Sequence, residues 1–158
     1  MILPGHIALA VLAAQVTGVD LRASLAASMA PDLVDKPTRW LLRLTPNDRI
    51  PAHTFLFWAA SSLLARALLG PRFARGWAVG YGIHLVADHV NSYLNPGRIY
   101  PWWPFRRYQM HTGPTGIKSS LNDFSPASLA IEGAAVVAAT LAWGIAHRRR
   151  QRRGDNKY

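Results

Sequence analysis

Residues 82–89 read GIHLVADH and lie inside an apolar stretch that runs from 74 to 94. His84 and Asp88 are four residues apart, so a helix would place both side chains on one face. His89 would point about 100° away from Asp88. Polar and charged groups on a buried helix cost free energy unless they are paired or bind something. The stretch therefore predicts a buried helix whose His84 and Asp88 hold a partner.

Apolar segments with helical spacing continue through most of the chain, and none alternates as a strand would. We expect an all-α fold, a compact bundle of about five to six apolar helices. The expected helices cover residues 5–17, 21–30, 53–70, 74–94 and 126–149, with a shorter one near 38–44. Prolines at positions 31 and 37 predict a break after the second helix, which would put Asp32 and Asp35 in a defined turn.

The composition limits the kinds of site and partner that this protein can have. Its 158 residues are enough for one domain with a core, and half of them are hydrophobic. Because there is no cysteine, any metal must be bound by imidazole and carboxylate. The net charge is +10, and the C-terminal segment HRRRQRRGDNK holds six of the eighteen Lys and Arg residues. Such a tail is typical of solvated, lipid-binding or nucleic-acid-binding segments; we rank nucleic acid last because the core offers no recognition module.

The C-terminal segment is the best candidate for crossing a membrane. Between Ala127 and His147 the only formally charged side chain is Glu132, and the length suits a bilayer at about 1.5 Å per residue. The arginines that follow fit the positive-inside pattern, which predicts a cytoplasmic tail. We therefore divide the chain into a helical domain, residues 1–125, and an apolar, membrane-spanning helix with a basic tail, residues 126–158. The alternative is an alanine-rich helix buried in a soluble bundle.

Six polar side chains interrupt the apolar segments at helix ends or on one helical face: His6, Asp32, Asp35, His53, His84 and Asp88. Folding could bring these three imidazoles and three carboxylates to a common point. Nitrogen and oxygen ligands without sulfur suit zinc, manganese or iron, and the set is large enough for two ions. Each residue alone is weak evidence, because a lone histidine beside an apolar run is more often hydrogen-bonded in a core.

The order of the short motifs is more specific than any one of them. A histidine near the N-terminus is followed by PDLVD, AHTF, HLVAD and then YPWWPF. This order resembles the YdjM-like family of membrane-bound metal-dependent hydrolases, whose members look distantly similar to zinc-dependent phospholipase C. The resemblance covers about residues 1–105. It implies an all-α hydrolase in the inner (cytoplasmic) membrane.

The resemblance also implies a role for each matching residue. The implied ligands of a divalent metal are His6, Asp32, His53, His84 and Asp88. The metal would be zinc, as one or two ions, with manganese or iron as alternatives. Asp32 or Asp35 would take the proton from a metal-activated water or bridge two ions. This chain departs from the family in PDLVDKP, where Lys36 stands near an expected histidine.

Two arginines complete the expected site. Arg39 and Arg49 lie in loops beside it, where either could clamp a phosphate bidentately. The leading hypothesis is a membrane-associated, metal-dependent hydrolase that acts on a phosphoester or lipid-like substrate, with membrane lipid as its partner. The alternative is a non-catalytic membrane scaffold or interaction protein whose His/Asp cluster is structural. A closed ligand set without a position for water would favour that alternative.

Overall fold

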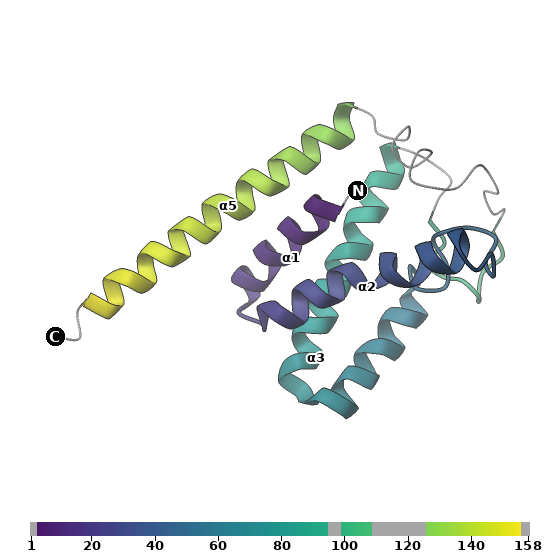
Figure 1. Ribbon diagram of the computed structural model, residues 1–158, viewed down its shortest axis with the longest axis horizontal. Coiled ribbons are helices and arrows are strands. Elements are labelled where there is room, and N and C mark those ends of the chain that lie inside the picture. The colour runs from purple at the N-terminus through teal and green to yellow at the C-terminus, as the bar shows by residue number, and fades with distance from the viewer. Residues whose placement is uncertain (1–2, 95–98, 109–125, 156–158) are drawn as a thin grey trace.

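The computed structural model describes residues 3–94, 99–108 and 126–155, and within these ranges it contains helices and no strand. The helices are, in chain order, α1 (Leu3–Thr17), α2 (Leu21–Trp40), α3 (Phe55–Leu94) and α5 (Pro126–Asp155). Figure 1 shows α1, α2 and α3 gathered together, with α5 extending alongside α1. The predicted all-α class is confirmed. The described residues form four helices, however, and not the expected five to six.

One reason for the lower number is that α2 continues where we predicted a break. Pro31 and Pro37 both lie inside this helix. Each proline removes a backbone hydrogen bond, at a cost of about 3 kcal/mol or more, so the local sequence favours a turn. Packing overrides that preference, because Ala27 of α2 is fully buried against α3. Asp32 and Asp35 therefore lie on a helix, and the prediction of a turn for them was wrong.

The other reason is that two expected helices are joined in α3. The helices expected at 53–70 and 74–94 form one element that bends at Gly70 (Figure 1). Gly70 has φ 83° and ψ 170°, a conformation that is essentially restricted to glycine. The short helix expected near 38–44 is also absent as a separate element, because α2 ends at Trp40 and turns follow.

The two arms of α3 lie against each other on either side of this bend. Trp58 of the first arm donates a hydrogen bond from Nε1 to the Ala78 carbonyl of the second arm, at 3.0 Å. Trp77 of the second arm donates from Nε1 to Ser61 Oγ at 3.1 Å. The start of the first arm and the later part of the second arm are thereby brought to the same end of the molecule, where the polar residues lie.

Small residues allow α1, α2 and α3 to approach closely. A Cβ atom at Gly80 of α3 would lie 2.0 Å from the Ser24 carbonyl oxygen of α2, closer than real atoms approach. Ser24 Oγ in turn donates to the Ala10 carbonyl of α1 at 3.2 Å. Tyr81, which is fully buried, donates from its hydroxyl to the Ala52 carbonyl at 2.5 Å. These contacts fix the three helices around the centre of the molecule.

Helix α5 is packed differently. Its contact with α1 forms a small core of three alanines, Ala8, Ala135 and Ala139. Its larger apolar side chains are exposed, with Val137 at 58%, Leu141 at 62% and Ile145 at 54%. The segment Pro126–Arg148 is long and apolar enough to cross a membrane. This exposure argues against the alternative of a helix buried in a soluble bundle.

Candidate metal centre

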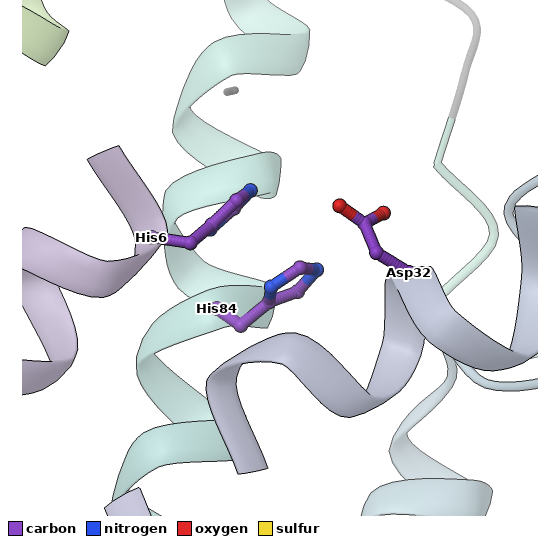
Figure 2. Close-up of side chains that lie close together, drawn as sticks. All are labelled: His6, Asp32 and His84. Carbon is purple, nitrogen blue, oxygen red and sulfur yellow. The ribbon is translucent and has the colours of Figure 1, made fainter. Parts of the chain in front are cut away.

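The five residues predicted as metal ligands come from separate parts of the chain and are all buried. Their side chains belong to α1 (His6), α2 (Asp32), the loop before α3 (His53) and the second arm of α3 (His84 and Asp88), and none is more than 7% exposed. Figure 2 shows His6, Asp32 and His84 directed from three helices toward the same region. The fold therefore assembles the predicted residues into one cluster.

Three ligand atoms in this cluster have the spacing of a tetrahedral metal site. His53 Nε2 lies 3.2 Å from His84 Nε2 and 3.3 Å from Asp88 Oδ2. His84 Nε2 and Asp88 Oδ2 are 3.6 Å apart. A tetrahedral zinc ion with bonds of about 2.0–2.1 Å has ligand atoms about 3.4 Å apart. Catalytic zinc sites commonly use three protein ligands and keep the fourth position for water or substrate.

The rings of His53 and His84 are held by their other nitrogens. His53 Nδ1 lies 2.7 Å from Asp35 Oδ2, and the two Asp35 oxygens also accept the backbone N–H groups of Ala52 and His53 at 2.9 and 3.0 Å. His84 Nδ1 lies 2.6 Å from the Ser28 carbonyl oxygen. In metal-binding histidines the second nitrogen normally donates to such an acceptor, which fixes the ring. Both rings therefore present Nε2 to the centre of the cluster.

His6 and Asp32 carry buried polar atoms that make no hydrogen bond within the described part of the chain. These atoms are both ring nitrogens of His6 and Oδ1 of Asp32. His6 stacks on His84 with ring centroids 3.8 Å apart, and its Nε2 lies 3.4 Å from Asp88 Oδ1. Together with His84, His6 and Asp32 form a second group of three ligand atoms within 4.8 Å of one another. Because buried polar atoms are nearly always satisfied, these atoms suit a cation that they could ligate.

Two basic side chains offset the carboxylates. Lys36 Nζ donates to Asp32 Oδ2 at 2.7 Å, one helical turn along α2. Arg49 Nη1 donates to Asp88 Oδ2, so its guanidinium lies at the edge of the three-atom group. Burial alone would raise the pKa of Asp32, but the ion pair with His53 and the nearby positive charges of Arg49 and Lys36 hold that pKa well below its usual range. Burial would also raise the pKa of Asp88, but Arg49 and His53 hold that pKa well below its usual range, so both carboxylates are ionised and available as ligands at neutral pH.

His53 carries the balancing proton when only protein atoms surround it. Burial alone would lower its pKa, but close contacts with the carboxylates of Asp32, Asp35 and Asp88 raise that pKa to about 10. A histidine that ligates a metal must be neutral at the ligating nitrogen, so metal binding releases a proton. A metal ion at this centre would replace the positive charge that His53 otherwise holds.

The two predicted substrate-binding arginines are placed differently. Arg49 reaches Asp88, as described above, and so lies against the cluster. Arg39 lies in the last turn of α2 and not in a loop, so that part of the prediction was wrong, because α2 continues past Pro37. Its Nη1 donates to the Thr45 carbonyl, in the loop after α2, at 3.1 Å. Arg49 thus remains the better candidate for contacting a substrate beside the cluster.

The roles of Ser28 and Lys36 were not predicted from the sequence. Ser28 acts through its backbone carbonyl, so its side chain gives no signal. Lys36 is four residues after Asp32, and this pairing would follow from the sequence if α2 were expected to continue past Pro31. The incorrect helix boundary therefore concealed the Lys36–Asp32 pair.

Comparisons with known proteins identify a family. The model of the family described as YdjM inner membrane protein matches residues 1–151, which is nearly the whole chain. No curated protein and no solved structure matches. The YdjM family inferred from the ordered motifs is confirmed as the family of this chain, and the match extends past residue 105 through the apolar segment of α5.

Proposed function

The chain belongs to the YdjM inner membrane protein family, and from its buried His/Asp cluster we propose that it is a metal-dependent hydrolase acting on a phosphoester or lipid-like substrate. The observation that carries the proposal is the 3.2–3.6 Å spacing of His53 Nε2, His84 Nε2 and Asp88 Oδ2. His84 belongs to both three-atom groups, and only its Nε2 would be available to an ion, because Nδ1 lies against the Ser28 carbonyl oxygen. We therefore favour one ion, with zinc first because the donors are nitrogen and oxygen at tetrahedral spacing.

The chain's own residues supply the other parts of the chemistry. A divalent ion held here would make water acidic enough to ionise near neutral pH and would offset charge on the substrate oxygens. Asp32 is the proposed proton acceptor, because its Oδ1 lies 3.4 Å from His53 Nε2 and makes no hydrogen bond within the described residues. Asp35 is the proposed positioning residue for His53, because both of its oxygens are already engaged. Arg49, beside Asp88, is the proposed contact for a substrate phosphate.

Metal analysis of the full chain, purified in detergent without chelator, tests the proposal together with hydrolysis of bis(p-nitrophenyl) phosphate. We expect about one ion per chain in the wild type, and loss of both the ion and the hydrolysis in His84→Ala. Asp88→Asn should behave nearly the same, because it removes a ligand charge and keeps the shape. His89→Ala is the matched control: the side chain is exposed, so both properties should remain.

Two results would contradict the proposal in different ways. Metal that is bound and lost with His84, but no hydrolysis of phosphomonoester, phosphodiester or phospholipid probes, would indicate a structural ion. A metal-free wild type with a stably folded His84→Ala variant would indicate that the cluster is satisfied by its own Lys36 and Arg49 pairs. Either outcome would favour a non-catalytic membrane scaffold.

A further inference from the structure

The contact between α1 and α5 contains two adjoining hollows, apart from the metal centre. The two helices run side by side in the same direction (Figure 1), and their alanines touch near Ala8 and Ala139. One hollow, the polar pocket, is lined by the end of α1, the start of α2, Arg72 of α3 and the later part of α5. The other, the α1–α5 groove, is lined by α1 and α5 alone. Trp143 lines both, so one ligand could occupy the two together.

The polar pocket has a volume of about 380 Å³, within the range of roughly 300–1,000 Å³ that is typical of small-molecule sites. Four of its lining residues have polar or charged side chains: Gln15, Asp20, Arg72 and His147. Arg72 brings a positive charge and Asp20 a negative one. The pocket thus offers both signs of charge within one small volume.

Two of these groups are hydrogen-bond acceptors. Gln15 Oε1 is buried and makes no hydrogen bond within the described part of the chain. Asp20 caps α2 by accepting the Ala23 backbone N–H at 3.0 Å, and an ionised carboxylate can accept further hydrogen bonds. A protonated primary amine supplies three N–H donors, so it would satisfy the Gln15 oxygen and pair with the Asp20 charge.

The other two groups are donors suited to an anion. Arg72 presents a guanidinium, which forms charge-assisted hydrogen bonds with phosphate. His147 Nε2 lies 3.1 Å from the amide nitrogen of Gln151 and can accept its N–H, which leaves Nδ1 as the ring nitrogen that can donate to an anion. The pocket as a whole therefore matches a ligand that carries a phosphate and a primary amine.

The α1–α5 groove suits the apolar remainder of such a ligand. It has a volume of about 470 Å³, and its lining is apolar apart from Thr140, whose hydroxyl donates to the Val136 carbonyl at 2.8 Å. The other lining side chains include Ile7, Val11 and Trp143. Because the Thr140 hydroxyl is already hydrogen-bonded, the groove is suited to a hydrocarbon chain.

The position of the two hollows along α5 agrees with a headgroup in the polar pocket and an acyl chain in the α1–α5 groove. His147 stands at the end of Pro126–Arg148, the segment able to cross a membrane, and the arginine-rich tail follows it. Tryptophan is enriched at membrane–water interfaces, which is where Trp143 would lie. The polar pocket would then lie at headgroup depth and the groove at hydrocarbon depth.

We propose that the polar pocket and the α1–α5 groove bind one aminophospholipid of the phosphatidylethanolamine type. Its phosphate binds Arg72 and His147, its ammonium binds Asp20 and Gln15, and an acyl chain lies in the groove beside Trp143. The proposal is independent of hydrolysis at the metal centre.

Native mass spectrometry of the full chain in detergent tests it with dioleoyl phosphatidylethanolamine and dioleoyl phosphatidylcholine. These lipids share acyl chains and phosphate but differ in N–H donors. We expect the ethanolamine lipid to bind about tenfold more tightly, the size of effect that a charge-assisted hydrogen bond produces. Asp20→Asn should abolish this preference and leave the fold intact, because asparagine caps helices as well as aspartate does.

Two matched pairs of variants distinguish binding of the lipid headgroup from binding of the acyl chain. Arg72→Ala should weaken both lipids about tenfold, whereas Arg75→Ala, exposed on the same helix and outside the pocket lining, should change neither. Val136→Phe should weaken both lipids by filling the groove. Val137→Phe, on the neighbouring exposed face, should not.

Several outcomes would overturn the proposal. One is equal binding of the two lipids by the wild type; another is a preference that persists in Asp20→Asn. Equal effects of the Arg72 and Arg75 variants would show non-specific attraction to charge. A dimer whose formation is blocked by Val136→Phe and not by Val137→Phe would show that a second copy of this chain covers the groove.

Discussion

Gly80 and Gly133 are both helical glycines, yet they mark regions that are packed in opposite ways. A Cβ atom at Gly80 would lie 2.0 Å from a backbone oxygen of α2, whereas one at Gly133 of α5 would meet nothing within 4 Å. Around Gly80 the helices touch backbone to backbone and enclose the polar cluster. Helix α5 contacts α1 through alanines and leaves its larger side chains exposed. The polar cluster is thus enclosed by the protein itself, while α5 needs an apolar environment from outside, as an inner membrane protein would have.

Gly80→Ala is expected to have the largest effect of the substitutions that test this comparison. The added methyl would force α2 and α3 apart, at a cost of about 3 kcal/mol or more in the free energy of unfolding. At this chain length the melting temperature should fall by on the order of 6–12 °C, measured by circular dichroism in detergent. Gly82→Ala is the control, because its Cβ would lie 3.8 Å from the nearest atom. Equal melting temperatures for the two variants would mean that α2 and α3 are not in close contact.

Val137→Arg tests the opposite region. Val137 lies near the middle of the candidate span and is 58% exposed. If it faces lipid, an arginine there costs about 2.5–3.5 kcal/mol on insertion scales. The fraction of protein that resists carbonate extraction from membranes should then fall, while Val137→Leu should behave as wild type. If Val137 faces water instead, the arginine should shift stability by no more than about 0.5 kcal/mol and leave membrane partitioning unchanged.

Asp35→Asn tests whether Asp35 orients the ring of His53 in the enclosed cluster. The amide removes the carboxylate that holds His53 Nδ1, although asparagine keeps nearly the same shape. Loss of such an orienting group lowers metal affinity by about 10- to 100-fold, and competition with a chromogenic chelator would measure the change for zinc. Asp20→Asn removes the same charge outside the cluster and should retain wild-type affinity. An unchanged affinity in Asp35→Asn would show that Asp35 does not orient the ring of His53.

Gly133→Ala should have the smallest effect, and its sign should be positive. Alanine is favoured over glycine inside a helix by about 1 kcal/mol, and the added methyl has open space around it. The melting temperature should rise by no more than about 4 °C. A clear decrease would mean that another molecule packs closely against this face of α5.

The sequence was sufficient to predict which polar residues cluster, but it was insufficient to predict the path of the chain between them. The helical spacing and the order of the motifs predicted that five residues would lie together: His6, Asp32, His53, His84 and Asp88. Polar side chains inside apolar helices are costly to bury unless they pair with one another or bind something. The continuation of α2 through Pro31 depends on packing against α3, and a prediction from local sequence does not include such tertiary contacts. The acceptor for His84 is a backbone carbonyl, and any residue type at position 28 would supply it.

The bend at Gly70 has a further consequence for how this chain tolerates change. His53 stands seventeen residues before Gly70 and His84 fourteen after it, so the two imidazoles meet because two arms of similar length fold back from one glycine. Inserting one residue between Gly70 and His84 would advance the second arm by about 1.5 Å and rotate His84 by about 100°. Such an insertion would leave composition and hydropathy almost unaltered and still separate the two rings. In related chains, differences in length should therefore concentrate in the loops and in the tail, and the two arms should keep their residue counts.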